Sequence, residues 1–277
     1  MGWLESIVLG AVQGLTEFLP ISSTAHLSLA GRLFFGGHDP GAAFSAVIQM
    51  GTNLAVLIYF WRDLVRIVKR WALSLAGKVP RSDPDARLGW FVILGSIPIG
   101  VIGFLFQDQI STGLRNLWVT VAMLAGVGVI LWIADRYAAT HSAKTMENLT
   151  LPDAIVFGLA QTCALIPGVS RSGATVAGGL FLGYTREAAA RYSFLLSLPA
   201  IWASGLYQLK DIGGDSVAWG PTILATAIAF VVGYAVIAWL LRYISTHDFR
   251  PFVLYRWLLA LVVAGLLVGG VLSPLGS

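Results

Sequence analysis

Charged residues are scarce in this chain of 277 residues, where Asp, Glu, Lys and Arg together make up 12% of the sequence. A soluble globular domain carries roughly 25% of them. Hydrophobic residues instead account for 57%, so the composition excludes an ordinary soluble domain. The net charge of +4 comes from loops and not from a continuous basic face. Nucleic acid is therefore not an expected partner.

The N-terminal segment lacks basic residues, and the chain has a single cysteine. No Lys or Arg precedes Arg32, and Glu5, Gln13 and Glu17 interrupt the first apolar segment. A cleavable signal peptide needs a positive start followed by an unbroken apolar region, so the segment is not predicted to be one. Cys163 is the single cysteine. It excludes an intrachain disulfide, and its apolar neighbours predict a packing role.

Long apolar runs are abundant. Six of them approach the roughly 20 residues that the hydrocarbon core of a bilayer requires, at residues 43–61, 88–106, 117–134, 191–209, 219–241 and 252–272. Trp and Tyr occur near several of their ends, as is usual for membrane helices. The sequence therefore predicts an all-α integral membrane protein, with one polytopic domain over residues 1–277 and six transmembrane helices.

The charges between the runs predict an orientation. Basic residues outnumber acidic ones in residues 62–87, which contain Arg62, Arg66, Lys69, Arg70, Lys78, Arg81 and Arg87. By the positive-inside rule this segment is a cytoplasmic loop. If the six spans alternate, the short connectors near 107–116 and 210–218 face outward, and both termini lie outside.

Two apolar regions, residues 3–35 and 153–185, are broken in the middle by "LPISST" and "IPGVSRSGAT". Pro20 and Pro167 each remove a backbone donor and end a helix, and the Ser and Thr residues that follow are good N-caps. Each region is predicted to be a re-entrant helical hairpin. Irregular backbone at membrane depth is tolerated where it lines a wet cavity, so the two turns should face a polar pocket.

The two hairpins resemble each other. "LGAVQGLTEFLPISSTAH" aligns with "FGLAQTCALIPGVSRSGA", which places Gln13 over Gln161 and Ser23 over Ser170. An apolar span follows each hairpin. With the predicted orientation, the hairpins enter from opposite sides. This pattern indicates an inverted-topology repeat, with repeat 1 at about 1–134 and repeat 2 at about 153–272, whose turns meet near the bilayer midplane.

Polar residues gather at the two breaks. Gln13 and Glu17 share a helix face before the first break, and the residues after it are Ser22, Ser23, Thr24 and His26. The second break carries Ser170, Arg171, Ser172, Gly173 and Thr175. An ionised side chain at bilayer depth costs about 2.5–3.5 kcal/mol. Charges in such positions are normally kept for a function.

The polar and charged residues at the two breaks together favour the binding of a phosphate group. Helix N-termini and Arg171 bind oxyanions, whereas Glu17 would act through a hard divalent cation that binds phosphate oxygens. Ser23 or a water is the candidate nucleophile, and His26 the candidate proton carrier. Structural alternatives remain for each residue: an interhelical hydrogen bond for Gln13, an interfacial position for His26, and an ion pair between Glu17 and Arg171. Glu187 and Arg191 are predicted to be interface charges.

The motifs "QGLTEFLPISSTAH" and "PGVSRSGAT" closely resemble the two signatures of the undecaprenyl-diphosphate phosphatase, or bacitracin-resistance protein, family. The resemblance extends over essentially the whole chain. It implies six spans and two re-entrant hairpins, and a bacterial inner-membrane hydrolase that converts undecaprenyl diphosphate to undecaprenyl phosphate for peptidoglycan synthesis. It also implies a divalent cation, Mg²⁺ or Ca²⁺, a site that opens to the periplasm, and a homodimer.

The resemblance further assigns residues. The acidic motif falls on Gln13 and Glu17, with Glu17 as metal ligand, because this chain has Gln13 where many members have Glu. Catalysis is carried over to Glu17, Ser23, His26 and Arg171. Phosphate binding is carried over to a larger set, Gln13, Ser22, Thr24, Ser170, Arg171, Ser172, Gly173 and Thr175. A lipid-phosphate translocator remains the alternative, since inverted repeats are transporter architecture.

Overall fold

The computed structural model describes residues 2–35, 42–106, 109–110, 116–208 and 218–275. Their named regular elements are all helical, and the only β contact is an isolated bridge between Lys144 and Tyr184. The α-helices are α1 (Trp3–Thr16), α2 (Ser23–Phe34), α3 (Ala42–Tyr59), α4 (Trp61–Leu75), α5 (Pro84–Leu105), α6 (Leu117–His141), α7 (Leu151–Thr162), α8 (Arg171–Phe181), α9 (Arg186–Gln208), α10 (Trp219–Ile244) and α11 (Arg250–Val268).

Four helices of the described residues, α5, α6, α10 and α11, are long and apolar enough to cross a membrane, with mean hydropathies of 2.1 to 2.3. The pair of α3 and α4 would add a fifth span, but it is bent by 78°. These helices confirm an all-α, multi-pass membrane protein. The count of six spans and two re-entrant hairpins stays a prediction, as do the repeat boundaries.

The segment predicted as a basic loop is largely helical, which corrects the loop assignment. Residues 61–75 form α4, and α5 begins at Pro84, where the Asp83 carboxylate caps the helix by accepting from Ala86 N at 3.1 Å. Ile67 and Trp71 lie on the face of α4 that packs against α5, and Trp71 meets Trp90 edge to face. An apolar face of this kind stabilises a helix that is rich in charge.

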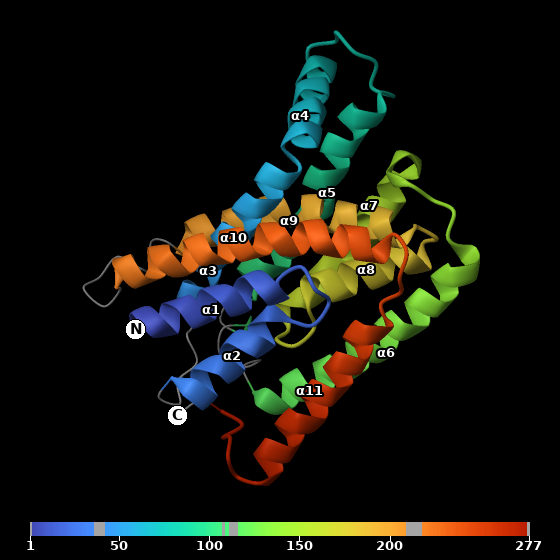
Figure 1. Ribbon diagram of the computed structural model, residues 1–277. Helices are drawn as coiled ribbons and strands as arrows, with labels where there is room; N and C mark the ends of the chain where they lie inside the picture. The colour runs from blue at the N-terminus through green and yellow to red at the C-terminus, as the bar shows by residue number, and fades with distance from the viewer. Residues whose placement is uncertain (1, 36–41, 107–108, 111–115, 209–217, 276–277) are drawn as a thin grey trace.

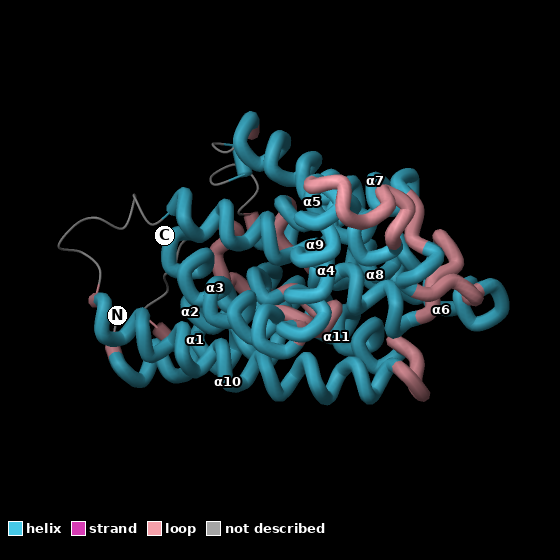
Figure 2. Tube along the Cα trace, turned by 90° about the horizontal axis from the view of Figure 1, so that it is seen from above, coloured by secondary structure: helices cyan, strands magenta, loops and turns pink. Residues whose placement is uncertain are grey.

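Each helix that leads into a break lies against a long helix from the other half of the chain. In both views α1 runs beside α10, and α7 packs against α5 in the same way (Figures 1 and 2). Glycines allow these close approaches: a Cβ at Gly10 would lie 2.4 Å from Ala225 O, and one at Gly158 would lie 2.3 Å from Gly95 O. The two hairpins are therefore held by backbone-to-backbone packing.

Cys163 and two of the histidines lie at the surface of the described structure. Cys163, predicted to pack, is exposed at the end of α7, because apolar neighbours do not distinguish a lipid-facing position from a core position. His141 and His247 are exposed at or just beyond helix ends, whereas His38 lies outside the described residues. The predicted outward connectors, near 107–116 and 210–218, fall largely outside the described residues as well.

Candidate functional site

Both predicted breaks are present, and each new helix starts at a capping serine. α1 ends at Thr16 and α2 begins after Ser22, whose Oγ accepts from Ala25 N at 3.4 Å. α7 and a short 3₁₀ turn end at Leu165, and α8 begins after Ser170, whose Oγ accepts from Gly173 N at 3.2 Å. In Figure 1 both ends of the first hairpin lie at the same side of the bundle.

The two capping serines share an unusual backbone conformation. Ser22 has a φ of 75° and Ser170 a φ of 69°, and they are the non-glycine residues with positive φ in the described part of the chain. Such a conformation costs a residue with a Cβ roughly 1–3 kcal/mol and tends to occur at functional sites. The strain occurs at the N-cap of the helix after each break. The structural match of Ser170 is therefore Ser22, which corrects the sequence alignment of Ser23 with Ser170 by one residue.

Glu17 lies at the centre of the site. Its carboxylate accepts from Gln13 Nε2 at 2.9 Å and from Ser23 Oγ at 2.7 Å, and it forms an ion pair with Arg171 of the second hairpin. Glu17 is 8% exposed and Gln13 is fully buried. The first break thus supplies the carboxylate and the hydroxyl, and the second break supplies the guanidinium. The ion pair that the sequence left open as a structural alternative is present.

A chain of hydroxyls also joins the turns. Ser172 Oγ donates to Leu19 O of the first turn at 3.0 Å, so the Ser170 hydroxyl donates in turn to Ser172 Oγ at 3.1 Å. Thr175 points elsewhere: its Oγ1 donates to Arg171 O at 2.7 Å and accepts from Ser193 of α9. Ser170 and Ser172 therefore belong to the meeting point of the turns, whereas Thr175 anchors α8 to α9.

His26 lies one turn into α2 and is not hydrogen-bonded to the central carboxylate. Its Nδ1 is 2.7 Å from Ser22 O, and since a carbonyl only accepts, Nδ1 carries the proton. Nε2 is 2.7 Å from the hydroxyl of Tyr255, which also stacks on the ring. Thr24, next to Ser23 at the N-terminus of α2, is half-buried. The geometry connects His26 to the Ser22 cap and to α11.

Arg256 is a residue of this region that the motifs did not reveal. It is 0% exposed, and its guanidinium donates at 2.9 to 3.2 Å to five backbone carbonyls, those of Pro20, Met123, Leu124, Gly168 and Val169. The sequence did hold a signal, because Arg256 is the one charged residue in the expected span 252–272. A charge at such depth costs about 2.5–3.5 kcal/mol when unsatisfied.

The site contains oxygen donors that fit a hard cation. Gln13 Oε1 is buried without a hydrogen-bond partner among the described residues, close to the Glu17 carboxylate that its own amide nitrogen contacts. Thr52 Oγ1 lies 3.4 Å from the same amide nitrogen. No group of three or more His, Cys, Asp or Glu side chains is arranged for a metal within the described residues. A cation here would depend on Glu17, neutral oxygens and the ligand.

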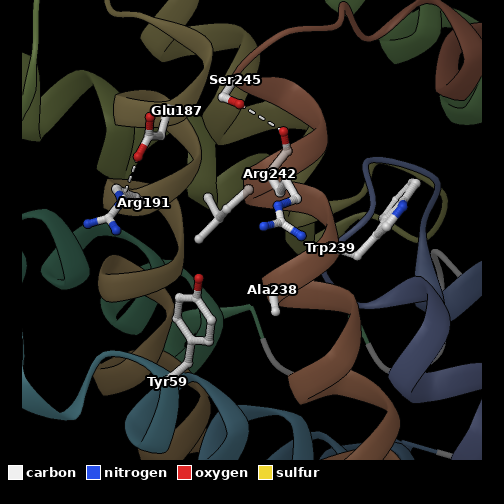
Figure 3. A pocket seen from close by; sticks show the side chains of 8 residues that line it. Tyr59, Glu187, Arg191, Ala238, Trp239, Arg242 and Ser245 are labelled. Carbon is white, nitrogen blue, oxygen red and sulfur yellow. Dashed lines mark hydrogen bonds and ion pairs between the residues drawn. The ribbon is translucent and has the colours of Figure 1, made fainter.

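A separate pocket lies between α3, α9 and α10, with a volume of about 670 Å³. It contains none of the residues at the breaks. Tyr59 and the guanidinium group of Arg242 point toward the space between α9 and α10, and Arg191 lies beside Glu187 (Figure 3). Arg191 pairs with Glu187 at 3.1 Å and with Asp63 at 3.8 Å. The acids compensate the charge of Arg191.

Comparison with known proteins gives consistent matches along the whole chain. Residues 6–262 match the family described as Bacitracin resistance protein BacA. The chain is 58% identical to "Undecaprenyl-diphosphatase 2" of Streptomyces coelicolor, over 99% of this chain and 98% of the relative. It is 56% identical to "Undecaprenyl-diphosphatase" of Micrococcus luteus, over 99% and 100% of the two chains. "Undecaprenyl-diphosphatase 2" of Frankia casuarinae is 59% identical, over 99% and 98%.

Proposed function

Because the chain belongs to the bacitracin resistance protein BacA family, we propose that it hydrolyses undecaprenyl diphosphate to undecaprenyl phosphate and inorganic phosphate. The observation that carries this proposal is the contact between the two breaks, where Glu17 accepts from Ser23 and pairs with Arg171. A carboxylate, a hydroxyl and a guanidinium are thereby gathered at one point between apolar helices. The reaction recycles a lipid carrier and accounts for bacitracin resistance in the family.

Substrate binding is assigned to the second break and the two helix N-termini. Arg171 presents a planar fork that matches two phosphate oxygens, and its side chain is 16% exposed. The N-termini of α2 and α8 add N–H groups and positive dipole ends. Ser22, Thr24, Ser170, Ser172 and Gly173 lie at these N-termini. The diphosphate competes with Glu17 for Arg171, so binding opens the ion pair.

Ser23 is the proposed nucleophile and Glu17 its base. The Ser23 hydroxyl already donates to Glu17 Oε2 at 2.7 Å, so this carboxylate can take the proton as Oγ attacks the terminal phosphorus. The bond from phosphorus to the bridging oxygen breaks, and undecaprenyl phosphate leaves. Water then hydrolyses the phosphoserine and releases inorganic phosphate. In this scheme His26 supports the Ser22 cap and does not act on Ser23.

The proposal includes Mg²⁺ or Ca²⁺ as cofactor. Glu17, Gln13 Oε1 and phosphate oxygens would hold it, because these are the hard oxygen donors that such cations select. When bound, the cation would neutralise charge on the diphosphate. The orphaned Gln13 Oε1 supports this assignment, and it gives the neutral Gln13 a role that requires no charge.

The proposal places the enzyme in the bacterial inner membrane as a homodimer with a site open to the periplasm. The excess of basic residues in α4 and the loop after it supports a cytoplasmic position for that side. The chain termini lie at the opposite end of the bundle (Figure 1). The dimer rests on the family resemblance alone, and cross-linking of the protein in native membranes tests it.

Phosphate release by the purified protein is the decisive measurement. In detergent with Mg²⁺, the protein should release inorganic phosphate from a polyprenyl diphosphate. Binding of the lipid without release would instead support the translocator, which needs only Arg171 and the helix N-termini. Phosphoserine trapped at Ser23 by acid quenching would identify the nucleophile. A matched reaction with Ser193→Ala, which lies behind Thr175 and away from Glu17, should still give the trapped species.

A further inference from the structure

One nitrogen of Arg256 connects the two hairpin turns. Nη1 donates to Pro20 O at 3.0 Å and to Val169 O at 3.2 Å. Pro20 lies two residues before the Ser22 cap, and Val169 lies directly before the Ser170 cap. The position of Arg256, on α11, thus fixes the spacing between the two caps from outside both hairpins.

The remaining N–H groups of Arg256 anchor this contact. Nη2 donates to Gly168 O and to Met123 O, and Nε donates to Leu124 O. A guanidinium has five N–H donors, so every one of them is used on a backbone carbonyl. No carboxylate of the described residues pairs with Arg256. The group is therefore saturated before any ligand arrives.

The other contacts between the turns behave differently when substrate enters. The ion pair between Glu17 and Arg171 uses the guanidinium that the diphosphate needs, so it opens when the substrate binds. Ser172 keeps a single hydrogen bond to Leu19 O. We propose that Arg256 is a positioning residue that holds the turn of Glu17 and Ser23 at a fixed distance from the turn of Arg171 during the reaction. This inference rests on the proposed function.

The conservative variant Arg256→Lys separates position from charge. A lysine keeps the positive charge, but its one nitrogen cannot reach the carbonyls of both turns and of α6. A misplacement of about 1 Å between reacting groups can cost on the order of a hundredfold in rate. For Arg256→Lys we therefore expect kcat to fall by about a hundredfold, while KM stays within about threefold, since Arg171 still binds the phosphate.

A distance measurement gives a second readout that does not depend on turnover. Spin labels at Leu15→Cys and Leu159→Cys, both exposed positions on the hairpins, are introduced with Cys163→Ala to remove the native thiol. The parent should give one narrow distance distribution between the hairpins, and Arg256→Lys a broader or longer one. The matched control is Arg250→Lys, because Arg250 is exposed on the same helix and should change neither kcat nor the distance.

These measurements distinguish a positioning role of Arg256 from direct contact with the substrate. A raised KM with normal kcat would assign Arg256 to substrate contact and overturn the positioning role, as would parental kcat and distances in Arg256→Lys. If Arg256→Lys does not fold, Arg256→Ala is assayed with added guanidinium, which should restore both kcat and the narrow distribution. Lack of rescue in a folded protein would also overturn the role. If the parent releases no phosphate, the proposed function fails, while the distance measurement still tests whether Arg256 fixes the spacing of the two turns.

A second inference concerns α4, which has three distinct faces. One face packs on α5 through Ile67 and Trp71. A second face is apolar and exposed, with Trp61 64% and Val68 58% exposed. Its residues recur at helical spacing, at Trp61, Val65, Val68, Ala72 and Leu75. The stripe extends over the whole helix, and each of its residues is exposed.

The third face of α4 is basic. Arg66 is held by Asp63 and Asp85, and Arg70 by Asp83, whose pKa is lowered by the hydrogen bond from Arg70. Arg62 and Lys69 are exposed and form no ion pair within the described residues. An exposed apolar stripe beside unpaired basic residues is the pattern of a helix that lies in a membrane interface.

The direction of α4 agrees with this pattern. The helix turns by 78° from α3, as a helix does when it leaves a transmembrane direction to run along the membrane surface. In Figure 1, α4 projects away from the bundle. We infer that α4 lies on an anionic lipid surface, with its apolar stripe in the acyl region and with Arg62 and Lys69 at the headgroups.

Spin-label accessibility tests this placement. Labels are placed singly at Val68 and Lys69 in the Cys163→Ala protein, reconstituted in phosphatidylcholine vesicles with or without phosphatidylglycerol. The label at Val68 should be reached by oxygen and not by a water-soluble nickel chelate, and the label at Lys69 should show the reverse. Phosphatidylglycerol should deepen the Val68 label, and Arg62→Gln with Lys69→Gln should remove that dependence. Equal access of the chelate to both labels, or protection of Val68 that depends on protein concentration, as a second copy would give, would overturn the inference.

Discussion

Replacing Glu17 by glutamine tests the centre of the proposed site, because the change preserves shape and removes one charge. In the parent, the Glu17 carboxylate accepts from Gln13 and Ser23 and pairs with Arg171. Glutamine at this position keeps one carbonyl oxygen that accepts hydrogen bonds, but it cannot take a proton from Ser23 or balance Arg171. We therefore expect both kcat and the free energy of unfolding to decrease, by amounts that can be measured separately.

The catalytic loss should be the larger effect. A positioned general base contributes about 10²–10⁴-fold, so kcat for phosphate release should fall by at least about a hundredfold. The stability loss follows from leaving a charge unpaired. Breaking a fully buried ion pair costs about 3–5 kcal/mol. Because Arg171 retains some exposure, we expect the low end, about 3 kcal/mol.

Two assays distinguish these effects. Phosphate release is measured at saturating lipid over a Mg²⁺ titration, and the thermal unfolding midpoint is measured in the same detergent. Glu187→Gln is the control, because Glu187 is half exposed and lies in the separate pocket. A Glu17→Gln protein with kcat within threefold of the parent would refute the assignment of Glu17 as base and metal ligand. A folded but inactive protein that no longer responds to Mg²⁺ is the expected result.

Three further substitutions test other parts of the site. Arg171→Lys should lose most activity with a raised KM, since an ammonium lacks the bidentate fork; near-normal kcat/KM would contradict this. Ser23→Ala should lower kcat by at least about a hundredfold and abolish the acid-trapped phosphoserine, whereas retained turnover would indicate water as the nucleophile. Gly158→Ala should lower the unfolding midpoint, at a cost of about 1–3 kcal/mol, because its Cβ meets Gly95 O. Gly126→Ala, which has open space, is the control.

The sequence predicted the parts of this structure that depend on local signals. A proline followed by hydroxyl residues marked both breaks, and Ser22 and Ser170 cap the helices that follow. The alignment of one hairpin with the other then led to the expectation that the turns meet. The contact between Glu17 and Arg171 agrees with that expectation, although the two residues are far apart in the chain.

Other features had no local signal that could identify their partners. Arg256 bonds only to backbone carbonyls, which every residue carries, so no complementary side chain in the sequence pointed to it. The positive φ of Ser22 and Ser170 arises from the tertiary arrangement of the turns, since serine does not favour it. His26 was linked to Ser23 by proximity in sequence, yet helical geometry turns its ring toward Tyr255.

The charges buried at the turns explain why the site would select a diphosphate. Arg171 and Arg256 bring two positive charges against the single negative charge of Glu17. The N-termini of α2 and α8 add a partial charge of roughly +0.5 each. In a low-dielectric setting this excess is unfavourable until an anion compensates it. A diphosphate supplies that compensation, whereas a neutral lipid does not. Inorganic pyrophosphate should therefore raise the unfolding midpoint of the parent, and this shift should disappear in Arg171→Gln but persist in Ser23→Ala.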